Sequence, residues 1–280
     1  MRKVLKVFLL LGIIFIVIGG VLFGIGIATN GFLDNSEIVT TNYDIEGTYS
    51  NIKINLISSN IEFKKSTDGT TSVLCEEKVK IKHEVKAEED ILSIDEYDLY
   101  KWYEKIFRFN FKTLKVIVNL PEDIYNDIEI KNVSGDIKID NYKFNSLNIN
   151  LTSGKVLLTN VDVVDKLDIK TTSGDINLKT VNTNDISIKV TSGDVSLNSV
   201  IATNSIIING TSGDVTLSKS DSLRIEINLT SGDVRGNILT GKNFDVSTVS
   251  GHKNYSAAIG DNGTFIIHIT SGSVDITLSI

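Results

Sequence analysis

Five aspartates recur at nearly constant spacing in the second half of the chain, and each directly follows a Ser-Gly pair. They are Asp136, Asp175, Asp194, Asp214 and Asp233. A column of stacked carboxylates could bind calcium, as in the nonapeptide repeats with a Gly-Gly-x-Gly-x-Asp pattern. Calcium takes about six to eight oxygen ligands, however, and one carboxylate per repeat supplies few of them. The column is also interrupted at Lys155, His252 and Ser273, so we expect a solvated ladder of corner residues and no metal site.

Three further aspartates, Asp162, Asp165 and Asp168, lie close together in the sequence. Clustered carboxylates on one face of a parallel β-helix are what a polysaccharide lyase or hydrolase of that fold requires. They define an enzymatic alternative, which loss of polysaccharide-degrading activity in Asp165→Asn would support. Because they flank the expected start of a strand, they are more typical of a turn.

The sequence offers no other arrangement typical of catalysis. His83, His252 and His268 are scattered, without the i, i+4 spacing of a helical zinc site, and there is no Gly-x-Ser-x-Gly elbow, Walker loop or dinucleotide fingerprint. The single cysteine, Cys75, can form neither an intramolecular disulfide nor a cysteine-based zinc site, and we expect a buried thiol. We therefore predict no catalytic residue, no cofactor and no metal, in a protein that is not an enzyme.

A short phrase ending in Ser-Gly organises the chain from residue 128 to 280. Its serines are 19 to 21 residues apart: Ser134, Ser153, Ser173, Ser192, Ser212, Ser231, Ser250 and Ser271. Counted from each serine as zero, positions −6 and −4 are apolar in all eight copies, and positions +3 and +5 in seven. This alternation predicts two short strands per repeat, with the Ser-Gly phrase as the corner between them.

Neither strand of a repeat can bury its inner face alone, so the fold class we predict is an all-β β-solenoid of parallel stacked coils. Each coil would hydrogen-bond to the coils above and below it, with the apolar positions forming internal ladders. Glycine suits a corner with positive φ, and the Ser and Asp side chains can satisfy corner amides. Eight corners at about 4.8 Å give a rod of about 40 Å. The sequence leaves the hand and the number of sides open.

The N-terminal segment, residues 7–33, contains no charged side chain. About 20 apolar residues at 1.5 Å each cross a bilayer core of about 30 Å, and the preceding Arg2, Lys3 and Lys6 place the N-terminus in the cytoplasm. A cleaved signal peptide ending near Ala28 is the alternative, but the apolar run is longer than a usual signal. We predict an uncleaved single-pass anchor in the cell membrane, with the C-terminal part extracytoplasmic.

Residues 38–120 alternate over short runs, which predicts further strands. Ser58-Ser59-Asn60 resembles a degraded copy of the repeat phrase, and Pro121 marks a break. Seven aromatic residues lie between Tyr97 and Phe111. They could form a surface for a partner or for the membrane interface. We favour a loop that covers the open end of the stack, because solenoids need atypical terminal caps.

The charge balance restricts the partners. The formal net charge is −7, and the three positive charges that precede Asp34 leave −10 for residues 34–280. An acidic ectodomain argues against nucleic acid and makes cationic ligands, including antimicrobial peptides, electrostatically plausible.

Taken together, the apolar N-terminal segment, Ser58-Ser59-Asn60-Ile61, the junction Val116–Pro121 and the tandem Ser-Gly-Asp coils resemble a bacterial β-strand-repeat family. It is a domain family of unknown function whose members are commonly labelled “putative adhesin”. The resemblance covers roughly residues 45–280 and implies a surface-facing β-solenoid, and some Gram-positive members are associated with envelope stress. It supplies no catalytic motif.

We therefore divide the chain into a cytoplasmic stub and anchor (residues 1–33), an N-terminal β region and cap (34–125) and the repeat solenoid (126–280). We expect an adhesin-like binding or scaffold protein of the cell envelope whose ligand is an envelope, surface or cationic-peptide molecule. A polysaccharide-acting enzyme and a purely mechanical spacer are the alternatives. The outward strand faces and the aromatic loop at 97–111 are the expected positions of any binding site.

Overall fold

The computed structural model describes residues 2–28, 37–101, 113–122, 124–255, 260 and 262–279. The N-terminal helix α1 comprises Arg2–Ala28. The predicted membrane crossing is not confirmed: no helix in the described part of the chain is both long enough and apolar enough to span a membrane.

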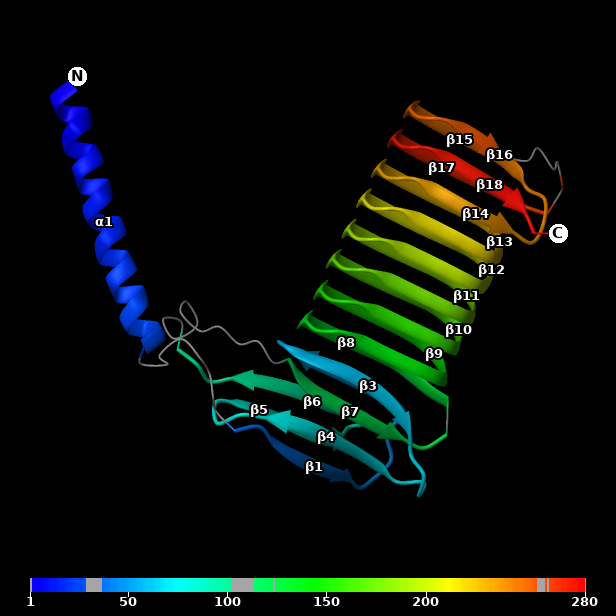
Figure 1. Cartoon of the computed structure of the whole chain (residues 1–280). Coiled ribbons are helices and arrows are strands. Elements are labelled where there is room, and N and C mark those ends of the chain that lie inside the picture. The colour runs from blue at the N-terminus through cyan, green and yellow to red at the C-terminus, as the bar shows by residue number, and fades with distance from the viewer. Residues whose placement is uncertain are drawn as a thin grey trace.

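The repeats form a parallel β-solenoid, as predicted (Figure 1). Consecutive coils pair in register, so that Val156 lies opposite Ile176 and Ser173 opposite Ser192. The inner positions −6, −4, +3 and +5 are buried in coil after coil, which makes one continuous core. The long strands that form these coils are β8 (Ile124–Ser134), β9 (Ile137–Ser153), β10 (Val156–Ser173), β11 (Ile176–Ser192), β12 (Val195–Ser212) and β13 (Val215–Ser231).

Each central coil bends at three points, one more than two strands require. The first is the glycine corner. The second lies seven residues after each corner serine, where non-glycine residues such as Asn160 and Thr180 have positive φ. The third is a register shift, for example between Val163 and Lys166. A third inward segment therefore lies between the two predicted strands, and its polar members, such as buried Thr183, concealed it from the alternation pattern.

The corner glycines are required by space as well as by backbone conformation. Gly174 has φ +150°, and a Cβ atom built on it would lie 1.7 Å from the carbonyl oxygen of Gly154 in the preceding coil. The same near-contact recurs between successive glycines along the column. Any side chain here would push two coils apart, so glycine sets the closeness of the stack.

At the N-terminal end the stack begins with a coil made of β2 (Asn51–Leu56) and β3 (Ser59–Lys65), which pair with β8 and β9. Its corner is the predicted degraded phrase. A Cβ on Gly135 would lie 2.5 Å from the Ser59 carbonyl oxygen, and the Asp136 amide donates to Asn60 Oδ1 at 2.7 Å. The Ser58-Ser59-Asn60 prediction is confirmed.

Beyond this coil lie β6 (Ile91–Asp98) and β7 (Leu114–Leu120), parallel to β2 and β3. The outermost strands are antiparallel: β4 (Thr71–Glu77) pairs with β7, β5 (Ile81–Glu88) with β6, and β1 (Val39–Ile45) with β4. These strands close this end of the stack. Most of the predicted aromatic cap, residues 102–112, lies outside the described residues.

The C-terminal end departs from the predicted order of stacking. The last three coils are β13 with β14 (Val234–Ile238), β15 (Asn243–Ser250) with β16 (Lys253–Tyr255), and β17 (Thr264–Ser271) with β18 (Val274–Leu278). The β17–β18 coil comes last in the sequence, but in the stack it lies between the other two (Figure 1). Our expectation that coils stack strictly in sequence order is therefore wrong here. The inserted coil has apolar Val274 at +3, whereas the terminal coil has Lys253. A coil with a charge at an inner position can lie only where one side is open.

A buried ion pair accompanies this insertion. Lys242 is 3% exposed and its Nζ lies 2.6 Å from Asp221 Oδ1. The same ammonium donates to Thr240 Oγ1 and to the carbonyl oxygen of Asn262, both at 2.7 Å. Because Asn262 leads into β17, Lys242 joins the connection before the terminal coil to the start of the inserted one.

Candidate binding groove along the solenoid

A long groove follows the outer surface of the stack, with a volume of about 1120 Å³. It is lined by the three residues that precede the corner serine in one coil after another, from Asn55 on β2 to Thr270 on β17 and Val249 on β15. Nine strands contribute, so the groove extends over about 40 Å at a strand spacing of about 4.8 Å. Its recurrence at one position of the repeat makes it a product of the stacking itself.

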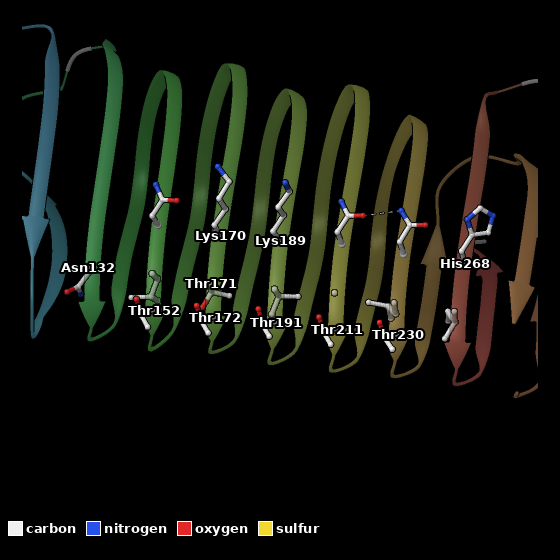
Figure 2. Close-up of a pocket in the computed structure, with 18 of the residues that line it drawn as sticks. Asn132, Thr152, Lys170, Thr171, Thr172, Lys189, Thr191, Thr211, Thr230 and His268 are labelled. Carbon is white, nitrogen blue, oxygen red and sulfur yellow. Dashed lines mark hydrogen bonds between the residues drawn. The ribbon is translucent and has the colours of Figure 1, made fainter. Parts of the chain in front are cut away.

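Two rows of polar side chains border the groove (Figure 2). One row lies three residues before each corner serine. It consists mainly of amides, lysines and a histidine: Lys131, Asn150, Lys170, Lys189, Asn209, Asn228 and His268. The other row consists mainly of exposed threonine side chains: Thr152, Thr172, Thr191, Thr211, Thr230 and Thr270. Neighbouring amides connect along the first row, where Asn228 Nδ2 donates to Asn209 Oδ1 at 3.1 Å. The groove therefore presents hydroxyl, amide and ammonium groups at a regular interval.

The middle of the groove carries two lysines side by side. Lys170 and Lys189 are direct register partners on β10 and β11, and Figure 2 shows both side chains on the groove surface. Like charges directly opposite one another in a sheet are destabilising. Lys170 shares the carboxylate of Asp168 with Lys166, at 3.6 and 3.2 Å, whereas Lys189 forms no ion pair with any described residue. The described lining contains no carboxylate.

Two buried polar atoms that line the groove lack hydrogen-bond partners among the described residues. Thr171 is 6% exposed and its Oγ1 is unpartnered; Asn132 is 3% exposed and its Oδ1 is unpartnered. The Asn132 Nδ2 group is used, because it donates to the Ser59 carbonyl oxygen at 2.8 Å. An unsatisfied buried polar group costs about 1–3 kcal/mol, so these two positions are not explained by the stability of the stack.

The Asp column, the first candidate from the sequence, belongs to the corner. Asp194 Oδ1 accepts the amide of Asp214 at 2.9 Å, and Asp214 Oδ1 accepts the amide of Asp233 at the same distance. Each carboxylate thus satisfies the corner amide of the next coil, as predicted for these side chains. Asn60 performs the same function at the first coil. Among the described residues no group of three or more His, Cys, Asp or Glu side chains could hold a metal ion.

The three clustered aspartates do not converge on one site. Asp162 accepts the Asn182 amide group at 2.8 Å and borders a second, smaller pocket of about 310 Å³. Asp165 lies at the register shift, where its carbonyl oxygen accepts the Thr183 hydroxyl. Asp168 lies beyond that shift and is held by Lys166 and Lys170. The predicted turn is found only at Asp165, because Asp162 and Asp168 lie on the paired parts of β10 on either side of the shift.

The histidines also separate. His268 lines the groove and His252 lies at a corner. His83 is buried in the N-terminal cap, with its Nδ1 atom 3.6 Å from Glu77 Oε1. Burial lowers the pKa of His83, although the negative charges of Glu96 and Glu77 oppose this shift. Cys75 is fully buried nearby, as predicted, and burial raises the pKa of its thiol to about 12.

Two carboxylates complete this cap cluster. Glu96 accepts the amides of Ile57 and Ser58 and the hydroxyl of Ser59 at 3.0–3.2 Å. Burial alone would raise the pKa of Glu77, but hydrogen bonds from Lys82, the His83 amide and Tyr43 lower it on balance. The cluster joins the cap strands to the corner of the first coil.

Sequence reasoning had restricted binding to the outward strand faces or the aromatic loop, and the groove lies on an outward face. It did not find the groove residues, because polar side chains at −3 and −1 are equally typical of an ordinary outward strand face. The signal was present in the recurrence of threonine at −1 and of lysine or asparagine at −3.

The family model described as Toastrack DUF4097 matches residues 49–207 and 162–279. The chain belongs to this family. The resemblance drawn from the sequence is thereby confirmed, and the Toastrack match covers both the first coil and the C-terminal coil that is inserted out of order. Among curated proteins, none matches the sequence significantly.

Three solved structures are similar to the chain over most of its length. A “putative adhesin” from Bacteroides fragilis is 18% identical with a TM-score of 0.49, covering 89% of this chain and 99% of its own. A “putative adhesin” from Parabacteroides distasonis is 14% identical with a TM-score of 0.49, covering 87% and 98%. A “putative lipid binding protein” from the same species is 14% identical with a TM-score of 0.48, covering 89% and 99%. Likeness at this level does not carry a ligand over to this Toastrack chain.

Proposed function

We propose that this Toastrack protein is a membrane-anchored, extracytoplasmic binding or scaffold protein of the cell envelope, which captures a ligand without transforming it. The observation that carries the proposal is the groove, because it offers polar groups at every coil over the whole length of the stack. A purely mechanical spacer would need the buried ladders and the corners but no such surface. The three clustered aspartates that an enzyme could use do not converge on one site.

The proposed location rests on the N-terminal sequence. Residues 7–33 lack charged side chains and follow three basic residues, which favours a cytoplasmic N-terminus and an outward-facing solenoid. Only a few residues separate this segment from β1, so the solenoid would lie close to the membrane surface. The family resemblance adds a role in envelope stress to the proposal.

The test uses the full chain with a C-terminal epitope tag in intact cells. We expect the protein in the membrane fraction, and we expect external protease to remove the tag without cell lysis. A variant lacking residues 7–28 is the control and should leave the membrane fraction. A tag protected from protease, or a full chain found in the soluble fraction, would contradict the location. Crosslinking in the same cells tests binding, and a deletion strain tests sensitivity to envelope-active antibiotics.

A further inference from the structure

We propose that the groove binds a linear anionic polysaccharide, with one of its carboxylate or phosphate groups held between Lys170 and Lys189. This inference rests on the proposed function as a surface binding protein and specifies its ligand. Three features of the groove carry it: its length, its charge and its unsatisfied buried groups.

The length of the groove calls for an extended polymer. Equivalent side chains repeat at every strand over about 40 Å, and a small molecule would meet only two or three of these repeats. Threonine hydroxyls and asparagine amides both donate and accept hydrogen bonds, which suits a chain carrying hydroxyl groups along its whole length.

The charge of the groove calls for an anion at one place. Lys170 and Lys189 lie side by side on the adjacent strands β10 and β11, and an anionic group between them would offset their repulsion. The carboxylates nearest to this place are already used. Asp168 is shared by Lys166 and Lys170, and Asp175 accepts the Asp194 amide at 3.3 Å and lies 3.4 Å from Lys155 Nζ. The Asp168 carboxylate therefore reaches Lys170, whereas no carboxylate of the described residues pairs with Lys189.

Thr171, whose buried hydroxyl has no partner among the described residues, follows Lys170 in the chain and also belongs to the lining. A buried hydroxyl without a partner is costly, and a ligand oxygen above it would supply the missing hydrogen bond. Thr171 and the lysine pair thus mark the same coils of the groove, the lysines on its amide and lysine row and Thr171 beside the threonine row.

Other polymers fit this surface less well. Single-stranded nucleic acid carries a charge on every unit and stacks its bases on aromatic side chains, whereas the described lining has three lysines over its full length and no Phe, Tyr or Trp. A lipid chain needs a continuous exposed apolar surface, whereas the apolar lining residues between the polar rows, such as Leu151, Val190 and Leu229, are only 3–6% exposed. A cationic peptide would meet the ammonium groups of the lysine pair.

The experiment measures binding of the full chain in lipid nanodiscs by biolayer interferometry. The probes are a linear polygalacturonate, a neutral linear glucan of similar length, inorganic polyphosphate and a cationic peptide. We expect the polygalacturonate to bind and to weaken as salt rises. The double variant Lys170→Gln/Lys189→Gln should lose about five- to tenfold in affinity, as expected for two exposed ion pairs. Lys179→Gln, an exposed lysine on β11 outside the groove, is the matched control and should bind as the wild type does.

Thr171→Val separates a ligand contact from a structural role. Replacing an unpartnered buried hydroxyl by a methyl group should leave the melting temperature unchanged or raise it, while binding of polygalacturonate weakens. Equal affinity of the double variant and the wild type would overturn the placement in the groove. Preference for polyphosphate, for the neutral glucan or for the cationic peptide would overturn the ligand class. The protease and fractionation results would still stand in each case, so failure of this inference is distinguishable from failure of the proposed location.

Discussion

The middle of the solenoid and its two ends are stabilised in different ways. From β9 to β12 the coils pair equivalent residue to equivalent residue, and the inner positions are mainly aliphatic. The buried charged side chains of the described chain all lie at the ends: Glu77, Lys78, His83, Glu96, Asp221 and Lys242. The last coil of a stack of identical coils leaves an edge of unpaired backbone groups, which can pair with another chain. The ends therefore need contacts that the repeats do not make, and the buried charged side chains with their specific partners supply these contacts.

The largest expected effect is in the middle, at the glycine column. Gly174→Ala should destabilise the fold by at least about 3 kcal/mol, because it adds backbone strain and a clash with the Gly154 carbonyl at 1.7 Å. Gly69→Ala is the matched control, since its φ is +77° with open space around the Cβ position. That variant should lose only about 1–2 kcal/mol. Urea unfolding followed by circular dichroism compares them, and equal losses would show that close approach does not matter at the corner.

At the C-terminal end, Lys242→Met should cost about 3 kcal/mol, because it leaves Asp221 buried without its cation. The double variant Asp221→Leu/Lys242→Met should recover most of that loss. Hydrogen exchange should become faster in β17 and β18 and stay slow in β10 and β11, which separates an end effect from a global one. Lys179→Met, at an exposed site, is the control. If Lys242→Met were as stable as the wild type, Lys242 would not be needed to hold the inserted coil in place.

The two regions also differ in how far the sequence predicts them. In the middle, the recurrence of apolar residues at −6, −4, +3 and +5 was sufficient for the ladders and corners, because repetition makes each coil evidence for the next. The third inward segment was missed because Thr183, Ser220 and Ser222 interrupt its apolar pattern. At the C-terminal end, Lys253 indicated an irregular coil. The repeat period and the polarity pattern do not, however, predict which coil will stack on which. The stacking order of the coils depends on how well whole coils pack against one another, and no local sequence pattern records this.

The candidate groove shows the same limit. Its residues repeat visibly in the sequence, yet a row of threonines is equally typical of an ordinary solvent face. The unpartnered state of Thr171 and the register of Lys170 with Lys189 are properties of the packed structure. They could not be read from spacing alone.

At the N-terminal end the expected effect is smaller and depends on pH. Burial lowers the pKa of His83 in the folded state, so the unfolded chain takes up a proton first as the pH falls. Stability should be complete above the ordinary histidine pKa of about 6.5 and should decrease as the pH drops below it, by at most about 1.4 kcal/mol per pH unit. The lowered pKa of Glu77 acts only at more acidic pH. Melting temperatures between pH 7.5 and 5.5 should show the slope in the wild type and in His252→Gln. The slope should be absent in His83→Gln, and its persistence there would assign it to another group.

The smallest effect returns to the middle and to the aspartate column. Asp194→Ala removes the acceptor for the Asp214 amide and should cost about 1 kcal/mol. Asp194→Asn keeps an acceptor oxygen in the same place, as Asn60 does at the first coil, and should cost less than half as much. Asp162→Ala, which loses only a side-chain contact with Asn182, is the surface control. If Asp194→Asn were as damaging as Asp194→Ala, the negative charge itself would be needed, and the column would regain its standing as a cation site. If asparagine rescues, the carboxylates act as corner hydrogen-bond acceptors, and the middle of the solenoid needs no cation along this column.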